Sequence, residues 1–304
     1  MKKVALFYHD IFLKHKTPHG HPERSERLVS IMDTLKGSDI WDSLVHLSPR
    51  KATDEDILRV HTAEHLAQMK KLVGYADPDT YVSEDSLEAA LYAAGSLLEA
   101  VDKCRSGQID RAFCAVRPPG HHAEANRAMG FCLFNNVAVG ARYAQKCGYK
   151  KIYIIDFDVH HGNGTQHMFY DDPDVFYFST HQSPHYPGTG SKDETGSGAG
   201  TGTTANYPMQ AGAGLKEYAI VYNDELPKSI AAFDPDMIIV SAGYDLHARD
   251  PLASIRVTDE GIDMIVSSIC KSKDVPAVFS LEGGYDLDAL AGSVLTTVKN
   301  LLKE

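Results

Sequence analysis

The feature that most constrains the fold of this chain is an apolar, β-branched run that ends in alternating carboxylates and an imidazole. The run covers residues 151–157 and leads into the sequence D-V-H-H-G. A short apolar run of this kind predicts a strand buried on both faces, as in a parallel sheet. In extended backbone every second side chain points to the same side. We therefore expect Asp156, Asp158 and His160 to converge at the carboxyl end of this strand, where open α/β sheets bind their ligands.

Three further apolar runs also end in polar side chains. Residues 113–116 lead into R-P-P-G-H-H, residues 238–242 into G-Y-D, and residues 279–281 into E-G-G-Y-D. Because parallel strands end on one side of a sheet, these groups should meet the first one there. Each motif alone is commonly structural, but three polar groups that converge without a cation are costly to bury. Two carboxylates and an imidazole suit a catalytic Zn²⁺ that keeps a coordination position open for water.

The rest of the chain alternates between strand and helix patterns. Strand patterns cover residues 4–8, 112–116, 151–157, 175–180, 237–242 and 277–281. Helix patterns cover residues 22–35, 62–73, 85–101, 136–146, 215–233, 259–271 and 287–302. This alternation predicts an α/β fold with a mostly parallel central sheet and helices on both faces.

Two local signals refine this prediction. Asp85, followed three residues later by Glu88, predicts a capped helix start. The glycine-rich stretch Pro187–Gly202 is predicted to be a loop, since strand and helix patterns resume after it. No repeat and no clear change of composition marks a boundary, so we predict one domain over residues 1–304.

Composition excludes several classes of protein. The formal charge of −11 and the pI of about 5.7 argue against nucleic acid as a partner. Five cysteines without a C-x-x-C pair indicate a reducing compartment. No apolar segment reaches the roughly 20 residues that span a bilayer, and the first apolar run is predicted to be a strand rather than a signal peptide. We therefore expect a cytoplasmic protein that does not bind membranes, and leave its oligomeric state open.

Taken together, the motifs resemble those of the zinc-dependent histone deacetylase family. R-P-P-G-H-H, G-F-C, D-F-D-V-H-H-G-N-G-T-Q, S-T-H, Y-P-G-T-G, S-A-G-Y-D and L-E-G-G-Y-D follow the family's order along the chain, and H-P-E-R near the N-terminus also fits. The resemblance is closest to the class II branch, with its bacterial histone deacetylase-like amidohydrolases and acetylpolyamine amidohydrolases. It implies the single-domain arginase-deacetylase fold, one zinc ion per chain and hydrolysis of acetyl or other short acyl amides.

The resemblance also implies roles for individual residues. The zinc ligands would be Asp158, His160 and Asp245. His121 and His122 would form the tandem pair, with proton transfer assigned chiefly to His122, and Tyr285 would donate a hydrogen bond to the oxyanion. The residues behind the two histidines would be Asp156 and Asn163. As a neutral amide, Asn163 should leave the pKa of His122 lower than a carboxylate would.

Further positions match the family's substrate tunnel and its potassium site. The tunnel residues would be Gly130, Phe131, Tyr186 and Leu252. The usual second wall is phenylalanine, so Tyr186 is a departure. A possible potassium ion would be held by backbone atoms of Asp156, Asp158, His160 and Thr180 and by the Ser179 hydroxyl.

The choice of substrate stays open between two amines. Polyamine-selective relatives of the animal type carry glutamate at the position of Leu252. Lysine-selective class II enzymes carry leucine there, as this chain does. This favours acylated lysine in peptides or proteins over acylated polyamines. Asp77 and Asp79 could meet a cationic group at the rim, or could simply form a solvated turn. Less favoured are an arginase-type ureohydrolase, whose D-A-H-x-D pattern is absent, and a non-catalytic acyl-binding module, which would lack a tandem histidine or the tyrosine.

Overall fold

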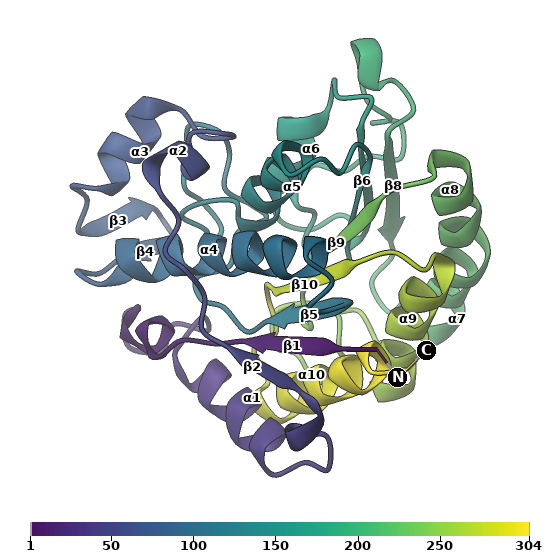
Figure 1. The fold of residues 1–304 in the computed structure, drawn as a ribbon, viewed down its shortest axis with the longest axis horizontal. Coiled ribbons are helices and arrows are strands. Elements are labelled where there is room, and N and C mark those ends of the chain that lie inside the picture. Colours follow the sequence, from purple (N-terminus) through teal and green to yellow (C-terminus); the bar gives the residue numbers. More distant parts are fainter. Residues whose placement is uncertain (1, 304) are drawn as a thin grey trace.

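The computed structural model describes residues 2–303, and its core is a parallel sheet of eight strands (Figure 1). The strand order is β2-β1-β5-β10-β9-β6-β7-β8, and each neighbouring pair is parallel. A separate antiparallel hairpin joins β3 (Gly74–Asp77) to β4 (Thr80–Val82). The strands of the sheet are β1 (Val4–Phe7), β2 (Val45–Leu47), β5 (Arg111–Cys114), β6 (Ile152–Asp156), β7 (Val175–Gln182), β8 (Thr204–Met209), β9 (Met237–Ala242) and β10 (Ala277–Leu281).

Helices cover both faces of this sheet. Every residue of β5, β6, β9 and β10 is buried, and successive side chains of a strand point to opposite faces. The helices are α1 (Glu26–Lys36), α2 (Asp54–Ile57), α3 (Ala63–Met69), α4 (Ser86–Arg105), α5 (Asn136–Lys146), α6 (Asn163–Phe169), α7 (Leu215–Ile220), α8 (Leu226–Phe233), α9 (Asp259–Ser272) and α10 (Leu287–Leu301). The predicted α/β class is confirmed.

All six predicted strands are present, but the elements at the sheet edges escaped prediction. β2 is a three-residue edge strand with two exposed residues, and β8 carries Asn206 and Pro208, so neither has an apolar run. The helix predicted over residues 215–233 is α7 and α8 joined by a π-helical turn at Val221–Glu225. The glycine-rich stretch is a loop, as predicted, with one short turn of 3₁₀ helix at Gly198–Gly200.

The predicted cap of α4 is wrong. Asp85 stands at the N-cap position but makes no side-chain capping hydrogen bond. Glu88 pairs with Lys51 at 3.0 Å instead of reaching back to the cap. The hydroxyl of Ser86, the first helical residue, lies 2.6 Å from Nδ1 of buried His15. Tertiary contacts, which the local sequence does not show, therefore replace the local capping pattern.

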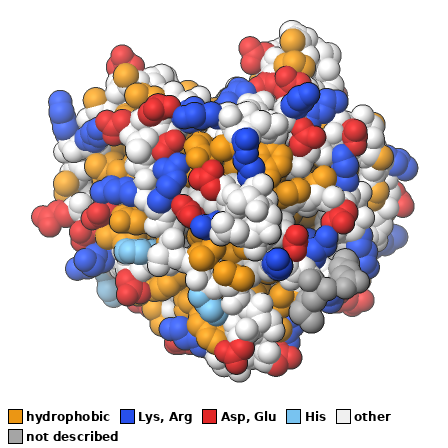
Figure 2. Space-filling model, viewed as in Figure 1, with side chains coloured by type: hydrophobic (Ala, Val, Ile, Leu, Met, Phe, Trp, Pro, Cys, Tyr) orange, Lys and Arg blue, Asp and Glu red, His pale blue; other side chains and the backbone are white. Residues whose placement is uncertain are grey.

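The surface carries charges of both signs. On the face shown in Figure 2, Lys and Arg side chains are interspersed with Asp and Glu, and apolar side chains lie between them. The net charge of −11 is therefore not gathered into one acidic region of that face. Within residues 2–303, no helix combines the length and the apolar character that crossing a membrane requires.

The sheet places the polar motifs together because they follow four adjacent strands. β5, β10, β9 and β6 are neighbours in the centre of the sheet (Figure 1). Their ends are nearly level, since Asp156 pairs in register with Ser241, and Ser241 with Ser280. The loops after these four strands therefore open at one edge of the sheet, as predicted.

Near this edge, buried His61 is held as a neutral imidazole. Its Nδ1 lies 3.0 Å from the carbonyl oxygen of Glu124, and its Nε2 accepts the backbone N–H of Asn135, the N-cap of α5, at 2.9 Å. A carbonyl can only accept, so Nδ1 carries the proton and Nε2 must stay unprotonated. Burial, with the neighbouring His65, lowers the pKa of His61 from 6.5 to about 3.

We expect this histidine to weaken the protein in acid. The unfolded chain takes up a proton near pH 6.5 that the folded chain refuses until about pH 3, so stability falls as pH falls through this window. At pH 5 the loss is about 2 kcal/mol of unfolding free energy. In urea unfolding, His61→Gln should shrink the difference between pH 7.5 and pH 5 by about this amount. The exposed His19→Gln serves as the control, and an undiminished difference in His61→Gln would contradict the prediction.

Candidate active site

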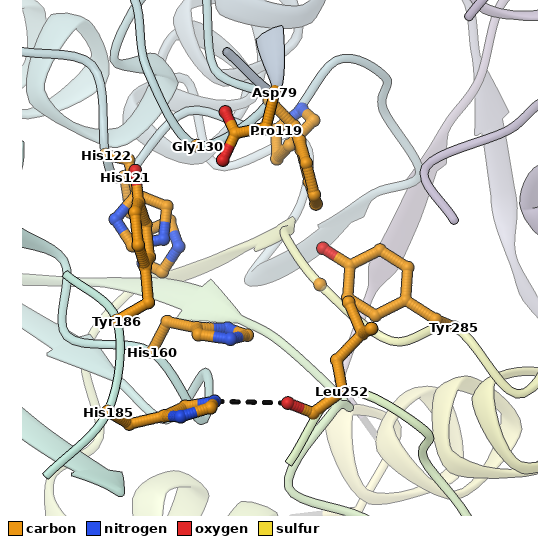
Figure 3. Close-up of a pocket in the computed structure, with 12 residues that line it drawn as sticks. Asp79, Pro119, His121, His122, Gly130, His160, His185, Tyr186, Leu252 and Tyr285 are labelled. Carbon is orange, nitrogen blue, oxygen red and sulfur yellow. Dashed lines mark hydrogen bonds between the residues drawn. The ribbon is translucent and has the colours of Figure 1, made fainter. Parts of the chain in front are cut away.

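A pocket of about 260 Å³ opens where the loops after the four central strands meet (Figure 3). It is lined by both tandem histidines, by His160 and by Tyr285. All four predicted tunnel residues also line it: Gly130, Phe131, Tyr186 and Leu252. The pocket therefore brings together side chains from segments more than 200 residues apart in the sequence.

Asp158, His160 and Asp245 form a compact group at this pocket. Each offers one ligand atom, and the three atoms lie within 4.8 Å of one another. His160 Nδ1 lies 3.1 Å from Asp158 Oδ1 and 3.1 Å from Asp245 Oδ2. Two of the three residues predicted to converge, Asp158 and His160, lie together here, but the predicted cause is wrong, because β6 ends at Asp156. Asp158 and His160 lie in the following loop, where Asp158 Oδ1 accepts the N–H of His160 at 2.9 Å.

Two glycines let the neighbouring loops approach these carboxylates. A Cβ atom on Gly243 would lie 1.9 Å from Asp158 Oδ2, and one on Gly283 would lie 2.2 Å from Asp245 Oδ2. The backbone N–H of Gly283 donates to Asp158 Oδ2 at 2.8 Å, and that of Val159 donates to Asp245 Oδ1 at 2.9 Å. These contacts hold the two buried acids close together, although like charges repel.

This arrangement fits a zinc ion. Ligand atoms about 2 Å from a tetrahedral zinc ion lie about 3.3 Å from one another, close to the 3.1 Å that separates His160 Nδ1 from each carboxylate. Burial, with the nearby Asp158, raises the pKa of Asp245 to about 7. A divalent cation would offset the electrostatic repulsion between these two buried carboxylates. Three protein ligands with an open position are typical of catalytic zinc sites.

The two tandem histidines differ in the side chain that contacts Nδ1 of each ring. His121 Nδ1 lies 3.0 Å from Asp156 Oδ2, a buried carboxylate that also accepts the hydroxyl of Tyr177 at 3.1 Å. Burial alone would lower the pKa of His121, but Asp156 and Asp158 outweigh it and raise the pKa to about 10. The contact with Asp156 therefore favours the protonated form of His121.

His122 is held in the opposite state. Its Nδ1 lies 2.8 Å from Asn163 Oδ1, while Asn163 Nδ2 donates to the carboxylate of Glu124 at 2.5 Å. The carboxylate fixes which end of the amide is the donor, so His122 Nδ1 carries the proton and Nε2 keeps its lone pair. Burial and the charge of His121 hold the pKa of His122 well below its usual range. His122 is thus a neutral imidazole with a free Nε2.

Two buried carboxylates anchor the turn that carries these histidines. Glu23 forms an ion pair with Arg117, with Arg117 Nη2 2.8 Å from Glu23 Oε2. Glu282 Oε2 accepts the N–H groups of Gly120 at 2.6 Å and His121 at 3.2 Å. Glu23 stands in the motif H-P-E-R and Glu282 in L-E-G-G-Y-D, but neither motif predicts this role from its spacing.

Tyr285 faces the histidines across the pocket (Figure 3). Its ring meets Phe131 edge-on, with centroids 6.0 Å apart, and the guanidinium of Arg27 lies 5.0 Å from its centroid. Burial holds the pKa of Tyr285 well above its usual range, so the hydroxyl keeps its proton and can donate a hydrogen bond.

The walls of the pocket include a histidine that the sequence analysis missed. His185 lines the pocket beside Tyr186, stacks on His160 with centroids 5.0 Å apart, and lies 3.1 Å through Nε2 from the carbonyl oxygen of Leu252. Tyr186 lies edge-on to His122 at 5.1 Å and is 38% exposed, so it stands at the mouth of the pocket. The position of His185 next to a predicted wall residue was the one available signal.

Of the two residues predicted at the rim, Asp77 and Asp79, only Asp79 is among the lining residues of the pocket. Asp79 lines the pocket, and burial, with Asp77, raises its pKa. Among the described residues, Asp77 is not part of the lining. Its Oδ1 accepts the N–H groups of Asp79 and Thr80, at 3.1 and 3.0 Å, and so shapes the turn between β3 and β4.

The potassium site stays a prediction. The hydroxyl of Ser179 lies 2.9 Å from His181 Nδ1, and that of Thr180 lies 2.9 Å from the hydroxyl of Tyr222. Both residues are buried in β7 beside β6, near Asp156. The predicted oxygen-bearing residues are thus neighbours, which is what a potassium site would need.

Comparisons with known proteins point the same way. The family description "Histone deacetylase domain" matches residues 21–301. A probable deacetylase of Archaeoglobus fulgidus is 39% identical over 294 residues, which cover 94% of this chain and 82% of the relative. Histone deacetylase 14, chloroplastic, of Arabidopsis thaliana is 38% identical over 314 residues, which cover 94% and 74%. The crystal structure of the HDA15 HD domain matches with a TM-score of 0.94 at 37% identity, covering 99% of this chain and 91% of that one.

Proposed function

This chain belongs to the histone deacetylase family, a family of hydrolytic deacetylases, and from that premise we propose that it is a zinc-dependent enzyme that removes acetyl or other short acyl groups from the ε-amine of lysine in peptides or proteins. One observation carries the proposal. A compact group of two carboxylates and an imidazole borders, through His160, the pocket that both tandem histidines and a buried tyrosine line.

The chain's own residues divide the work of amide hydrolysis. Zinc held by Asp158, His160 and Asp245 would polarise the substrate carbonyl and lower the pKa of a water molecule. His122 takes the proton of the attacking water on its free Nε2 and returns it to the leaving amine. The imidazolium of His121 favours the negative charge that develops, and the hydroxyl of Tyr285 donates a hydrogen bond to the oxyanion.

The walls support an acylated lysine as the substrate. Phe131, Tyr186 and Leu252 line the pocket with largely apolar surface, which suits the methylene groups of a lysine side chain. Leu252 brings no charge to the wall where a polyamine would need its second amine met. The carboxylate of Asp79 in the lining is the one observation that favours an acylated polyamine as the alternative.

A comparison of two substrate classes tests this proposal. We expect the purified protein to hydrolyse an acetyl-lysine peptide with a higher kcat/KM than acetylputrescine or acetylspermidine. A chelator should abolish turnover and added zinc should restore it, because the proposed reaction requires a metal ion bound to Asp158, His160 and Asp245. Equal or better kinetics on the polyamines would favour the alternative, and turnover that survives full removal of metal would overturn the zinc mechanism.

A further inference from the structure

We propose that Asp250 is a positioning residue for Tyr285, because its carboxylate links the backbone of the tyrosine to that of Leu252, which also lines the pocket. The inference rests on the proposed role of Tyr285 as the oxyanion donor. Asp250 does not line the pocket among the described residues, so any effect on the reaction must pass through other groups.

The geometry joins two loops through one side chain. Asp250 is 8% exposed, and its Oδ2 accepts the backbone N–H of Tyr285 at 2.6 Å and that of Asp286 at 3.3 Å. Its Oδ1 accepts the N–H of Leu252 at 3.0 Å. Hydrogen bonds to a carboxylate are shorter and stronger than those between neutral groups. One buried carboxylate therefore holds both the loop after β10 and the loop after β9.

The same chain of contacts continues around the pocket. The carbonyl oxygen of Leu252 accepts from Nε2 of His185, 3.1 Å away (Figure 3). His185 in turn stacks on His160. Asp250 thus belongs to a hydrogen-bonded path from the backbone of Tyr285 through Leu252 to His185.

Tyr285 needs this hydrogen bond because the two glycines before it allow the backbone many conformations. β10 ends at Leu281 and α10 begins at Leu287, so the tyrosine lies in a loop. Gly283 and Gly284 precede it, and Gly284 has a φ of +117°, a region open to glycine and rarely used by other residues. Arg27 Nε binds the carbonyl oxygen of Gly284 at 2.7 Å and so holds the loop before the tyrosine. Asp250 holds the N–H of the tyrosine itself.

An oxyanion donor depends on exact placement more than substrate binding does. A hydrogen bond to the transition state weakens steeply when the donor shifts by about 0.5 Å. Loss of the Asp250 tie should therefore lower kcat, whereas the acyl-lysine methylenes, held by the walls, should bind with little change in KM.

Asp250→Ser isolates the tie to Tyr285. A serine hydroxyl can still accept the N–H of Leu252, two residues further on, and so preserve the local turn. It is too short to reach the N–H of Tyr285. We expect Asp250→Ser to lower kcat about tenfold or more, and Asp250→Asn, whose amide oxygen can still face Tyr285, to lower it less. Zinc content should stay at one per chain. Asp56→Ser alters a buried carboxylate that bonds Thr53 and Arg50 and, among the described residues, does not line the pocket, so it should leave kcat unchanged.

The decisive measurement is a double-mutant cycle with Tyr285→Phe. Tyr285→Phe alone should lower kcat by about 10²–10³. In that background Asp250→Ser should have almost no further effect, because its target has already been removed. An equal loss in both backgrounds, or a folded Asp250→Ser with native kcat, would overturn the inference. If Asp250→Ser does not fold, Asp250→Asn replaces it in the same cycle. A loss of kcat that disappears in the Tyr285→Phe background supports the inference, and a loss that persists there overturns it. Native turnover of Tyr285→Phe would instead refute the proposed function.

Discussion

Replacing Asp245 by asparagine is expected to remove zinc from the protein and nearly all of its turnover. Asp245 is one of the two buried carboxylates of the proposed zinc site, and a neutral amide oxygen is a much weaker zinc ligand than a carboxylate. A Lewis-acid metal contributes several kcal/mol to the transition state of amide hydrolysis. Its loss corresponds to a decrease of about 10³-fold or more in kcat/KM.

Asparagine is chosen because it should preserve the fold. Its oxygen can still accept the N–H of Val159, which Asp245 Oδ1 now accepts at 2.9 Å. Zinc per chain, measured by elemental analysis, and hydrolysis of an acetyl-lysine peptide are the two readouts. Asp102→Asn, which alters a carboxylate bonded to the hydroxyl of Tyr143 outside the pocket, is the matched control. A variant that keeps full zinc and full activity would show that Asp245 is not a ligand.

The site could be predicted from the sequence because its residues follow buried strands. An apolar run such as 152–156 indicates a strand of a parallel sheet, and parallel strands end on one side. Polar residues that directly follow such runs must therefore share an edge. What the sequence did not show is that β5, β10, β9 and β6 are adjacent, since strand order depends on how the connections cross.

Local geometry inside the site was less predictable. The alternation of Asp156, Asp158 and His160 suggested one extended strand, yet only Asp156 belongs to β6. Asp158 and His160 still lie together, because Asp158 Oδ1 accepts the N–H of His160 in the loop after the strand. Side chain to backbone bonds of this kind depend on the precise turn, which the spacing alone does not determine.

Residues that act through tertiary partners escaped the sequence altogether. Asp250 bonds the N–H of Tyr285, 35 residues away, and His185 bonds the carbonyl of Leu252, 67 residues away. Neither stands in a spacing that local rules interpret. The cap predicted at Asp85 failed for the same reason, since the first helical hydroxyl is engaged by distant His15.

The two tandem histidines should respond very differently to removal. His122→Ala is expected to lower kcat by about 10²–10⁴, the usual contribution of a general acid–base group. Its Nδ1–H is held by Asn163, so the free Nε2 is the position that can exchange a proton with water and amine. His121 is the poorer proton acceptor, because its Nδ1 lies 3.0 Å from the buried carboxylate of Asp156, which favours the protonated form.

His121→Ala is the matched comparison, because it removes an adjacent imidazole of the same burial but a different charge state. It should cost less in kcat than His122→Ala, since it removes charge stabilisation and leaves the proton acceptor in place. Neither histidine belongs to the carboxylate–imidazole group, so both variants should keep one zinc per chain. If His121→Ala proves the more damaging, or if His122→Ala retains native kcat, the roles derived from Asn163 and Asp156 are reversed or wrong.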